Sequence, residues 1–283
     1  MLDTQQIMKT ALKLAQFSRI PADSEIHVKG RKLRRVLVAI DVGVSELLLA
    51  KNLNCDGVIA HHPAGGSAQL EGYKVFLSHI EQMKAAGVPP DVAREAVKNK
   101  FRVLDIQHHP ENYDQTPSAA KKLGLPLVTI HSPCDEIGRR MIVQAIKGLG
   151  EDATVRQLVS RIGAFPEFRN AETRIEVRLG SPHRRAGKVA ISHACYTNGG
   201  YDVAKAYFQH GVDTLSYIHI SEADLTKLAS EGFASLVVLG HIASDWLGIN
   251  RVLRELEKND IEPVSTTDLY KIGVSKCDST NVY

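Results

Sequence analysis

The sequence predicts an α/β protein with mixed, mostly parallel sheets. Three observations carry this prediction: short apolar, β-branched runs recur along the 283 residues, helical patterns separate many of them, and one irregular stretch interrupts the alternation. Strands that alternate with helices pair mostly in parallel, because a parallel connection needs a long crossover and a helix usually supplies it.

Nine apolar runs give the expected strands. They cover residues 35–40, 57–61, 101–107, 126–131, 173–180, 187–193, 213–220, 235–241 and 261–267. Helices are expected at 45–53, 117–124, 201–211 and 250–260, the last two from apolar residues at three- and four-residue spacing, and the first 21 residues are typical of an amphipathic helix. Thr116 and Pro117 are a typical helix start, and Gly124 is a typical helix end.

The stretch from about 133 to 186 departs from this alternation. Residues 134–162 have a helical pattern, and an irregular, charged segment follows around 165–173. We therefore expect a single unit, 1–283, with approximate lobes 1–133 and 134–283. The sequence has no Pro/Gly/Ser-rich linker and no low-complexity tract, and we expect no internal repeat.

Composition excludes several classes of protein. The chain is 43% hydrophobic and 24% charged, and its formal net charge of +3 is too small to favour a nucleic-acid partner. No run approaches the ~20 apolar residues that span a membrane, and the N-terminus lacks a signal-peptide pattern, so we expect a cytoplasmic protein. G-x-G-x-x-G, Walker and G-x-S-x-G motifs are absent, which disfavours nucleotide-cofactor oxidoreductases, P-loop NTPases and serine hydrolases.

Polar clusters follow three of the expected strands, where ligands bind in open α/β sheets. His61 and His62 end the run 57–61 and precede a proline, and HHPENYD (108–114) follows the run 101–107. His241 and Asp245 follow the run 235–241 and lie four residues apart, which places them on one face of a helix.

Imidazoles and carboxylates together suit zinc, iron, manganese, cobalt or nickel, whereas calcium prefers oxygen donors alone. The donors outnumber those of one open zinc site, so they favour two metal ions that share a carboxylate. A second interpretation stays open, because single histidines at strand ends are often structural and satisfied by hydrogen bonds.

The segments VLVAIDV and LLLAKNLNCDGVIAHHP, together with GHIASD, resemble two signatures of the NIF-three-like proteins, a dinuclear metal centre family also labelled GTP cyclohydrolase I type 2 homologues. The resemblance covers about 35–268. It implies two intertwined α/β lobes, a hexameric ring and a set of metal ligands. These ligands are His61, His62, Asp114 as the bridging carboxylate, His241 and Asp245.

The chain departs from the family pattern at three places. Asp245 stands where the family usually has glutamate, and the usual W-D-N-x-G-L opening is missing. The family also tends to have a histidine four positions before its bridging aspartate, whereas Pro110 stands four before Asp114.

Further polar residues near strand ends are candidates for proton transfer. These are His193, His219 and Glu222, with His109 and Asn112 as weaker candidates. Asp41 is expected to cap the helix that follows it, although it could instead orient a ligand histidine. Asn198-Gly199-Gly200 is expected to form an ordinary turn rather than an anion site.

These features predict a hydrolase that uses two divalent metal ions and acts on an unknown small molecule, for which the family label suggests a nucleotide. The alternative is a non-catalytic metal-binding, metal-handling or regulatory interaction protein. A homo-oligomer is expected in either case, and a membrane partner in neither.

Overall fold

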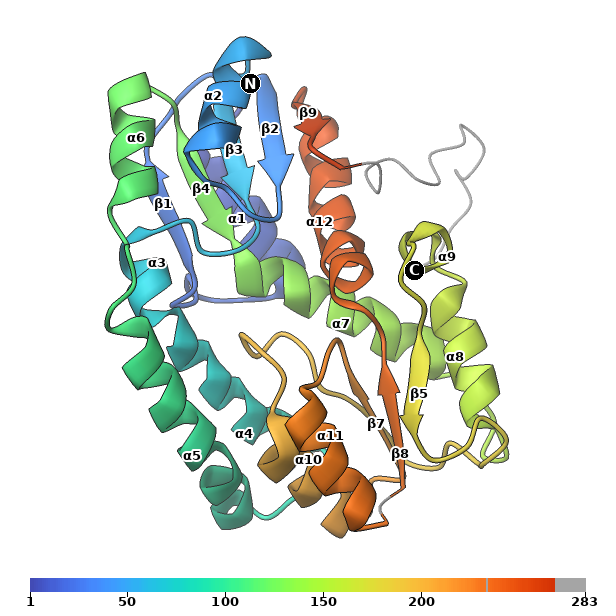
Figure 1. Cartoon of the computed structure of the whole chain (residues 1–283). Helices are drawn as coiled ribbons and strands as arrows, with labels where there is room; N and C mark the ends of the chain where they lie inside the picture. The colour runs from blue at the N-terminus through green and yellow to red at the C-terminus, as the bar shows by residue number, and fades with distance from the viewer. Residues whose placement is uncertain (233, 268–283) are drawn as a thin grey trace.

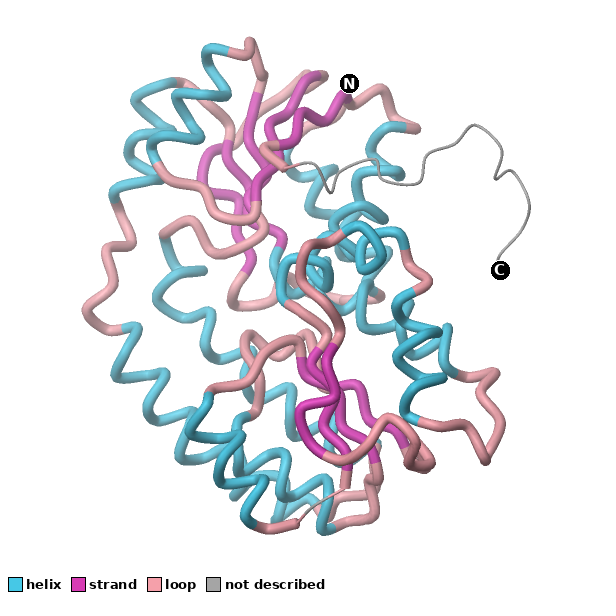
Figure 2. The backbone as a smooth tube through the Cα atoms, turned by 45° about the vertical axis from the view of Figure 1, so that its right-hand side comes forward, coloured by secondary structure: helices cyan, strands magenta, loops and turns pink. Residues whose placement is uncertain are grey.

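The computed structural model describes residues 1–232 and 234–267, and within them it has two sheets (Figures 1 and 2). The first sheet has the order β1-β4-β3-β2-β9 and the second has the order β5-β8-β7-β6. Most strand pairs are parallel, and the exceptions are β1 with β4 and β5 with β8. The predicted α/β class with mixed, mostly parallel sheets is confirmed.

The strands are short, and eight of the nine expected runs contain one. Their bounds are β1 Ser24–Val28, β2 Arg35–Ala39, β3 Gly57–Ala60, β4 Leu127–Ile130, β5 Glu176–Leu179, β6 Val189–Ile191, β7 Thr214–Tyr217, β8 Ser235–Val238 and β9 Glu262–Ser265. The last strand, β9, returns to the first sheet and pairs with β2, so the first sheet combines residues from both expected lobes.

Helices cover both sheets and connect them. Their bounds are α1 Thr4–Ala15, α2 Val44–Asn52, α3 Gly66–Glu71, α4 Ser78–Ala85, α5 Pro90–His108, α6 Gln115–Leu123, α7 His131–Ile146, α8 Val155–Gly163, α9 Pro166–Asn170, α10 Gly200–Gln209, α11 Glu222–Ser230 and α12 His241–Glu257, with a 3-10 helix η1 at Gly72–Leu77. Within the described residues, no helix is both long and apolar enough to span a membrane.

The strand expected at 101–107 is wrong, because this segment belongs to the 19-residue helix α5. Pro90 occupies the first turn of α5, where proline's missing N–H costs nothing. Ala93, Val97 and Leu104 are buried along one side of it, which is the spacing of a helix that packs on a core. The edge strand β1 was not expected.

Helices α7 and α12 cross between the two sheets (Figure 1). Each follows a parallel strand closely, since α7 starts directly after β4 and only two residues separate β8 from α12. Apolar side chains of both helices, among them Ile137, Trp246 and Ile249, share one buried core cluster with strands of the first sheet. The two helix N-termini therefore meet where the sheets face each other.

Candidate metal centre

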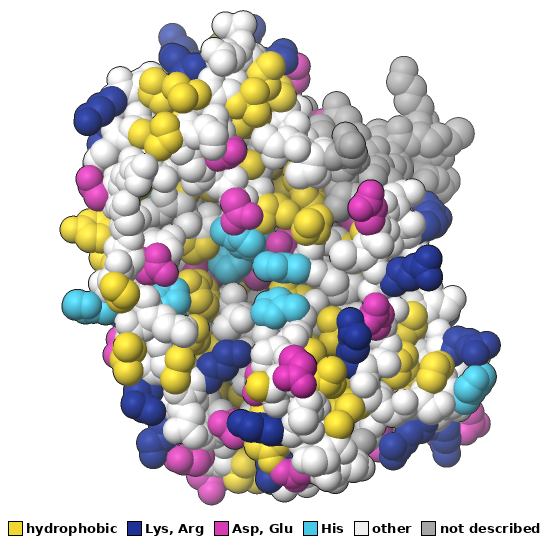
Figure 3. Space-filling model, viewed as in Figure 1, with side chains coloured by type: hydrophobic (Ala, Val, Ile, Leu, Met, Phe, Trp, Pro, Cys, Tyr) yellow, Lys and Arg dark blue, Asp and Glu magenta, His cyan; other side chains and the backbone are white. Residues whose placement is uncertain are grey.

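Six side chains from three chain segments gather between the sheets. His61 and His62 follow β3, His131 and Asp135 lie in the first turns of α7, and His241 and Asp245 lie in the first turns of α12. They form three overlapping groups whose donor atoms lie within 4.8 Å of one another: His61/His62/His131, His62/His241/Asp245 and His61/Asp135/Asp245. Figure 3 shows histidine side chains at the middle of one face of the molecule.

The rings of the adjacent histidines lie side by side just beyond the end of β3. Their backbone N–H groups still bond to Ala39 and Ile40, each at 2.9 Å, and their rings lie 5.0 Å apart at an interplanar angle of 37°. Gly65 then takes a φ of 141°, and a Cβ there would lie 2.5 Å from Pro117. A side chain at position 65 would therefore clash with Pro117 at the start of α6 and with the backbone of Tyr113.

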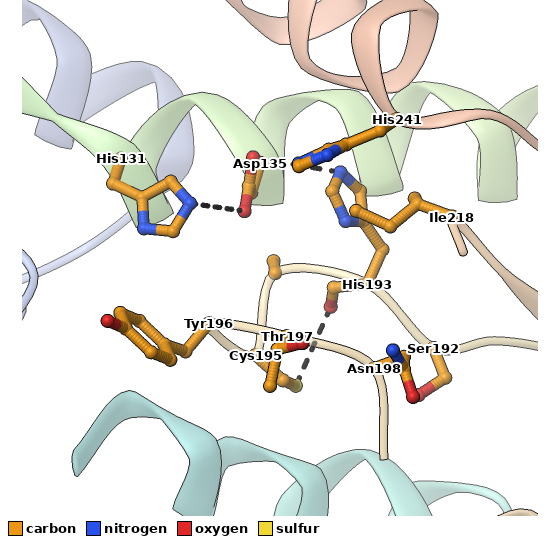
Figure 4. A pocket seen from close by; sticks show the side chains of 11 residues that line it. His131, Asp135, Ser192, His193, Cys195, Tyr196, Thr197, Asn198, Ile218 and His241 are labelled. Atoms are coloured by element: carbon orange, nitrogen blue, oxygen red, sulfur yellow. Dashed lines mark hydrogen bonds and ion pairs between the residues drawn. The ribbon is translucent and has the colours of Figure 1, made fainter. Parts of the chain in front are cut away.

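Each of the two carboxylates faces three imidazoles. Asp135 oxygens lie 3.3 Å from Nε2 of His61, 3.5 Å from Nε2 of His131 and 3.7 Å from Nε2 of His193. Figure 4 shows His131 and His193 directed toward Asp135 on α7.

The second carboxylate repeats this arrangement. Asp245 Oδ2 lies 3.6 Å from Nε2 of His61, 3.6 Å from Nε2 of His62 and 3.4 Å from Nε2 of His241. His61 is thus common to both carboxylates and lies between them.

These separations fit donors that share a metal ion. Two donors that each lie about 2.1 Å from an ion, at a tetrahedral angle, lie about 3.4 Å from each other. Direct hydrogen bonds are shorter, at about 2.7–3.2 Å. His61 Nε2, Asp135 Oδ1 and Asp245 Oδ2 are buried and have no hydrogen-bond partner within the described residues. Because unsatisfied buried polar atoms are costly, these residues fit a bound cation.

The electrostatics of the cluster favour ionised carboxylates. Burial by itself raises the pKa of Asp245, but the neighbouring imidazole of His61, with help from His62 and His241, brings this pKa well below its ordinary value. Burial likewise raises the pKa of Asp135, and the neighbouring histidines lower it overall. Burial lowers the pKa of His241, which favours the neutral imidazole that can bind a metal.

Two further aspartates orient the histidines. Asp41 Oδ1 lies 2.8 Å from Nδ1 of His62, and Asp23 Oδ2 lies 2.9 Å from Nδ1 of His131. Both contacts leave Nε2 of the histidine directed into the cluster, as second carboxylates do in many metal sites. The expectation that Asp41 caps a helix is wrong, since Gly43 is the N-cap of α2.

Two glycines let α7 and α12 approach closely. A Cβ at Gly248 would lie 1.9 Å from the carbonyl oxygen of Cys134, and a Cβ at Gly138 would lie 3.2 Å from that of Ser244. The contacts are reciprocal, because each glycine meets the residue just before the other helix's aspartate. The segments HSPCDEIG and HIASDWLG thus share the pattern H-x-x-x-D-x-x-G, an internal repeat that was not expected.

Four of the five residues expected as ligands lie in this cluster, namely His61, His62, His241 and Asp245. The fifth, Asp114, joins none of the groups of described residues. It is the exposed N-cap of α6, and both its carboxylate oxygens accept a hydrogen bond from the Ser118 hydroxyl. The second carboxylate of the cluster is that of Asp135, and Asp114 lies outside the cluster because the segment before α6 is exposed.

His131 and Asp135 were missed, although a signal for them was present. They follow an expected strand, and they have the same four-residue spacing as His241 and Asp245. A histidine four positions before an aspartate, the spacing that the family resemblance leads us to expect, occurs at 131 and 135, whereas Pro110 stands four before Asp114.

The residues expected to transfer protons lie around the cluster. His193 is buried beside Asp135, and the ring centroid of His219 lies 5.2 Å from that of His241. A groove of about 640 Å³ is lined by His219, Glu222, His241 and the strand β5. A smaller inner pocket shares Ile218 and His241 with this groove and reaches Asp135 (Figure 4). His109 and Asn112 are exposed.

Comparisons with known proteins concern the family and the fold of the chain. The family model described as Duf34/NIF3 (NGG1p interacting factor 3) matches residues 26–271. A crystal structure of a NIF3 superfamily protein from Sphaerobacter thermophilus is 44% identical, with 94% of this chain and 98% of that one covered and a TM-score of 0.91.

More distant structures share the fold. Reduced HcgD from Methanocaldococcus jannaschii is 11% identical over 93% of this chain and 97% of its own, with a TM-score of 0.59. A protein of Thermus thermophilus is 14% identical over 94% of this chain and 98% of its own, with a TM-score of 0.54. A comparison with curated proteins found no match.

Proposed function

The chain belongs to the Duf34/NIF3 family, and from this premise and its paired carboxylates we propose that it is a hydrolase dependent on two divalent metal ions. The observation that carries the proposal is that Asp135 and Asp245 each face three imidazoles and share His61. One such set would suit a single ion, whereas two adjoining sets suit a pair.

The two sets divide the donors. Asp135 and His131 would hold one ion, Asp245, His62 and His241 would hold the other, and His61 lies within reach of both carboxylates. A pair of divalent ions in such a centre lowers the pKa of water and polarises a carbonyl or phosphoryl oxygen. Zinc, iron, manganese, cobalt and nickel all accept this mixture of nitrogen and oxygen donors.

The surrounding residues supply access and proton transfer. His61, Asp135 and Asp245 are 1%, 4% and 1% exposed, so bulk water is largely excluded from the carboxylates. The His241 side chain is 44% exposed and opens toward the groove, whose volume is within the range of small-molecule sites. His193 lines the inner pocket and His219 and Glu222 line the groove, which supports the proposal that these residues contact the substrate or move its protons. A nucleotide, suggested by the family label, is the first substrate class to test.

Metal removal tests the proposal. Protein purified without chelators would be screened against nucleotides, phosphate esters and cyclic amides, then stripped of metal and reloaded. We expect turnover that disappears when the metal is removed and returns when it is added back. Turnover should also fall at least ~100-fold in Asp135→Asn, because a metal ligand is lost, whereas Asp114→Asn should keep wild-type turnover. Turnover that persists in the metal-free protein would contradict the proposal.

The burial of the carboxylates also favours a second candidate, a protein that binds metal without turnover. This candidate predicts bound metal in the same residues and no product in the screen. The homo-oligomer implied by the family resemblance stays a prediction under both candidates, and light scattering of the purified protein would check it.

A further inference from the structure

A line of hydrogen bonds runs from α5 to the groove beside the candidate metal centre. Lys100 Nζ donates to the carbonyl oxygen of Asn198 at 2.6 Å and lies 3.2 Å from its Oδ1. Asn198 in turn lies against His219, with 2.9 Å between Nδ2 and the ring Nδ1. His219 lines the groove next to His241, whereas Asn198 lines the inner pocket (Figure 4).

The orientation of the Asn198 amide is determined by its neighbours. Its Oδ1 accepts hydrogen bonds from Lys100 and from the backbone N–H of Gly200, the latter at 2.9 Å. An ammonium group and a backbone N–H are donors only, so the reverse orientation would place the amide NH₂ against two donors. Asn198 is buried, with 6% of its surface exposed, and such a clash could not be relieved by water.

The amide orientation determines the tautomer of His219. Because Nδ2 of Asn198 can only donate, Nδ1 of His219 must accept and carries no proton. A neutral imidazole has its single proton on the other nitrogen, which is then a donor. His219 therefore offers an N–H to the groove and has no free acceptor nitrogen.

We propose that Asn198 is a positioning residue that holds His219 in its Nε2–H form, so that His219 donates a hydrogen bond to an oxygen of the substrate in the groove. The tautomer of His219 follows from its hydrogen bond to Asn198 alone, whereas the role of His219 toward a substrate rests on the proposed hydrolase function. The ligand class is a small molecule with a carbonyl, carboxylate or phosphoryl oxygen placed beside His241. A fixed donor of this kind stabilises negative charge that develops on such an oxygen.

Nitrogen NMR on protein labelled with ¹⁵N-histidine tests the tautomer without any substrate. The His219 signals are assigned by their loss in His219→Gln. We expect an unprotonated Nδ1 and a protonated Nε2 in the wild type. In Asn198→Asp the new carboxylate can only accept, so Nδ1 should become protonated. Asn112→Asp, at an exposed asparagine whose side chain bonds to Gln115, adds the same charge and should leave the His219 signals unchanged.

A protonated Nδ1 in the wild type would overturn the proposal, even if Asn198→Asp did not fold. An Nδ1 that stays unprotonated in folded Asn198→Asp would overturn it as well. These outcomes do not depend on turnover, so they are distinguishable from a failure of the hydrolase proposal.

Once a substrate is identified, two variants of His219 test the donor role. Glutamine keeps an N–H donor but cannot shuttle protons, whereas leucine removes both properties. We expect His219→Gln to keep kcat within about 10-fold and His219→Leu to lower it about 100-fold, the scale of one lost oxyanion donor. Equal losses in the two variants would refute the donor role. If no substrate is turned over, the donor role fails with the hydrolase proposal and the tautomer remains.

Discussion

Gly248→Ala should separate the two helices that carry the carboxylates. The new Cβ would lie 1.9 Å from the carbonyl oxygen of Cys134, and this neighbour is backbone, which cannot rotate away. A comfortable carbon–oxygen contact is about 3.3 Å, so α12 must move about 1.4 Å from α7. Metal sites tolerate ligand shifts of only about 0.2 Å, so the Asp135 and Asp245 donor sets should come apart.

The energetic cost follows from two opposing effects. Overpacking a buried contact costs about 1–3 kcal/mol or more, whereas replacing glycine in a helix by alanine returns about 1 kcal/mol. We expect a net loss of about 2 kcal/mol in the free energy of unfolding, measured by denaturant titration of the metal-free protein. Metal content, measured on the same preparation after reloading, should fall below half of the wild-type value.

Two matched glycines separate this effect from helix propensity. Gly163→Ala lies at the end of α8 with only Ile175 at 3.9 Å, so it should keep or slightly raise stability and leave metal content unchanged. Gly138→Ala, with its nearest contact at 3.2 Å, should give an intermediate loss. The helix-crossing explanation is refuted if Gly248→Ala unfolds at the same denaturant concentration as the wild type and binds as much metal.

Three further predictions concern aspartates and one buried histidine. Asp135→Asn should lose at least one equivalent of metal while Asp114→Asn loses none, and equal metal content in the two variants, measured by elemental analysis, would contradict the assignment. Asp41→Ala should weaken metal binding about 10–100-fold in a competition titration, because His62 loses the partner on its Nδ1; unchanged affinity would show that the contact is incidental. Burial lowers the pKa of His79 from 6.5 to about 4. Between these pH values the unfolded chain binds a proton at His79 and the folded chain does not, so the free energy of unfolding falls by up to about 3 kcal/mol as the pH drops from 6.5 to 4. His79→Gln should flatten that part of the stability curve, and an unaltered slope would exclude His79 as its source.

Local patterns predicted most of the sheet residues and the adjacent histidines. Runs such as 35–40 and 57–61 are apolar and β-branched because the strands they form are buried on both faces, and this burial is visible in sequence. The run 101–107 was wrongly predicted as a strand because a short apolar segment fits the period of a strand and of a helix equally well. Its neighbours Ala93 and Val97, at helical spacing, show that the segment continues a helix. Strand β1 (SEIHV) lies at a sheet edge and is largely polar, so it lacks the apolar run by which the other strands were predicted.

The candidate metal donors were harder to predict because they come together through tertiary packing. The distance between Asp135 and Asp245 depends on how closely α7 and α12 cross, which two small residues far apart in sequence determine. Asp114 was implied by the family resemblance, and nothing local in the sequence distinguishes a ligand there from the exposed helix cap that the structure shows.

Anomalous X-ray scattering from crystals of metal-loaded protein is the decisive measurement, with data collected at the absorption edge of the bound element. Two peaks are predicted, one near Asp135 and His131 and one near Asp245, His62 and His241, each about 2.0–2.2 Å from its nitrogen and oxygen donors. A single peak elsewhere on the protein, or no peak among these side chains, would contradict a shared two-metal centre.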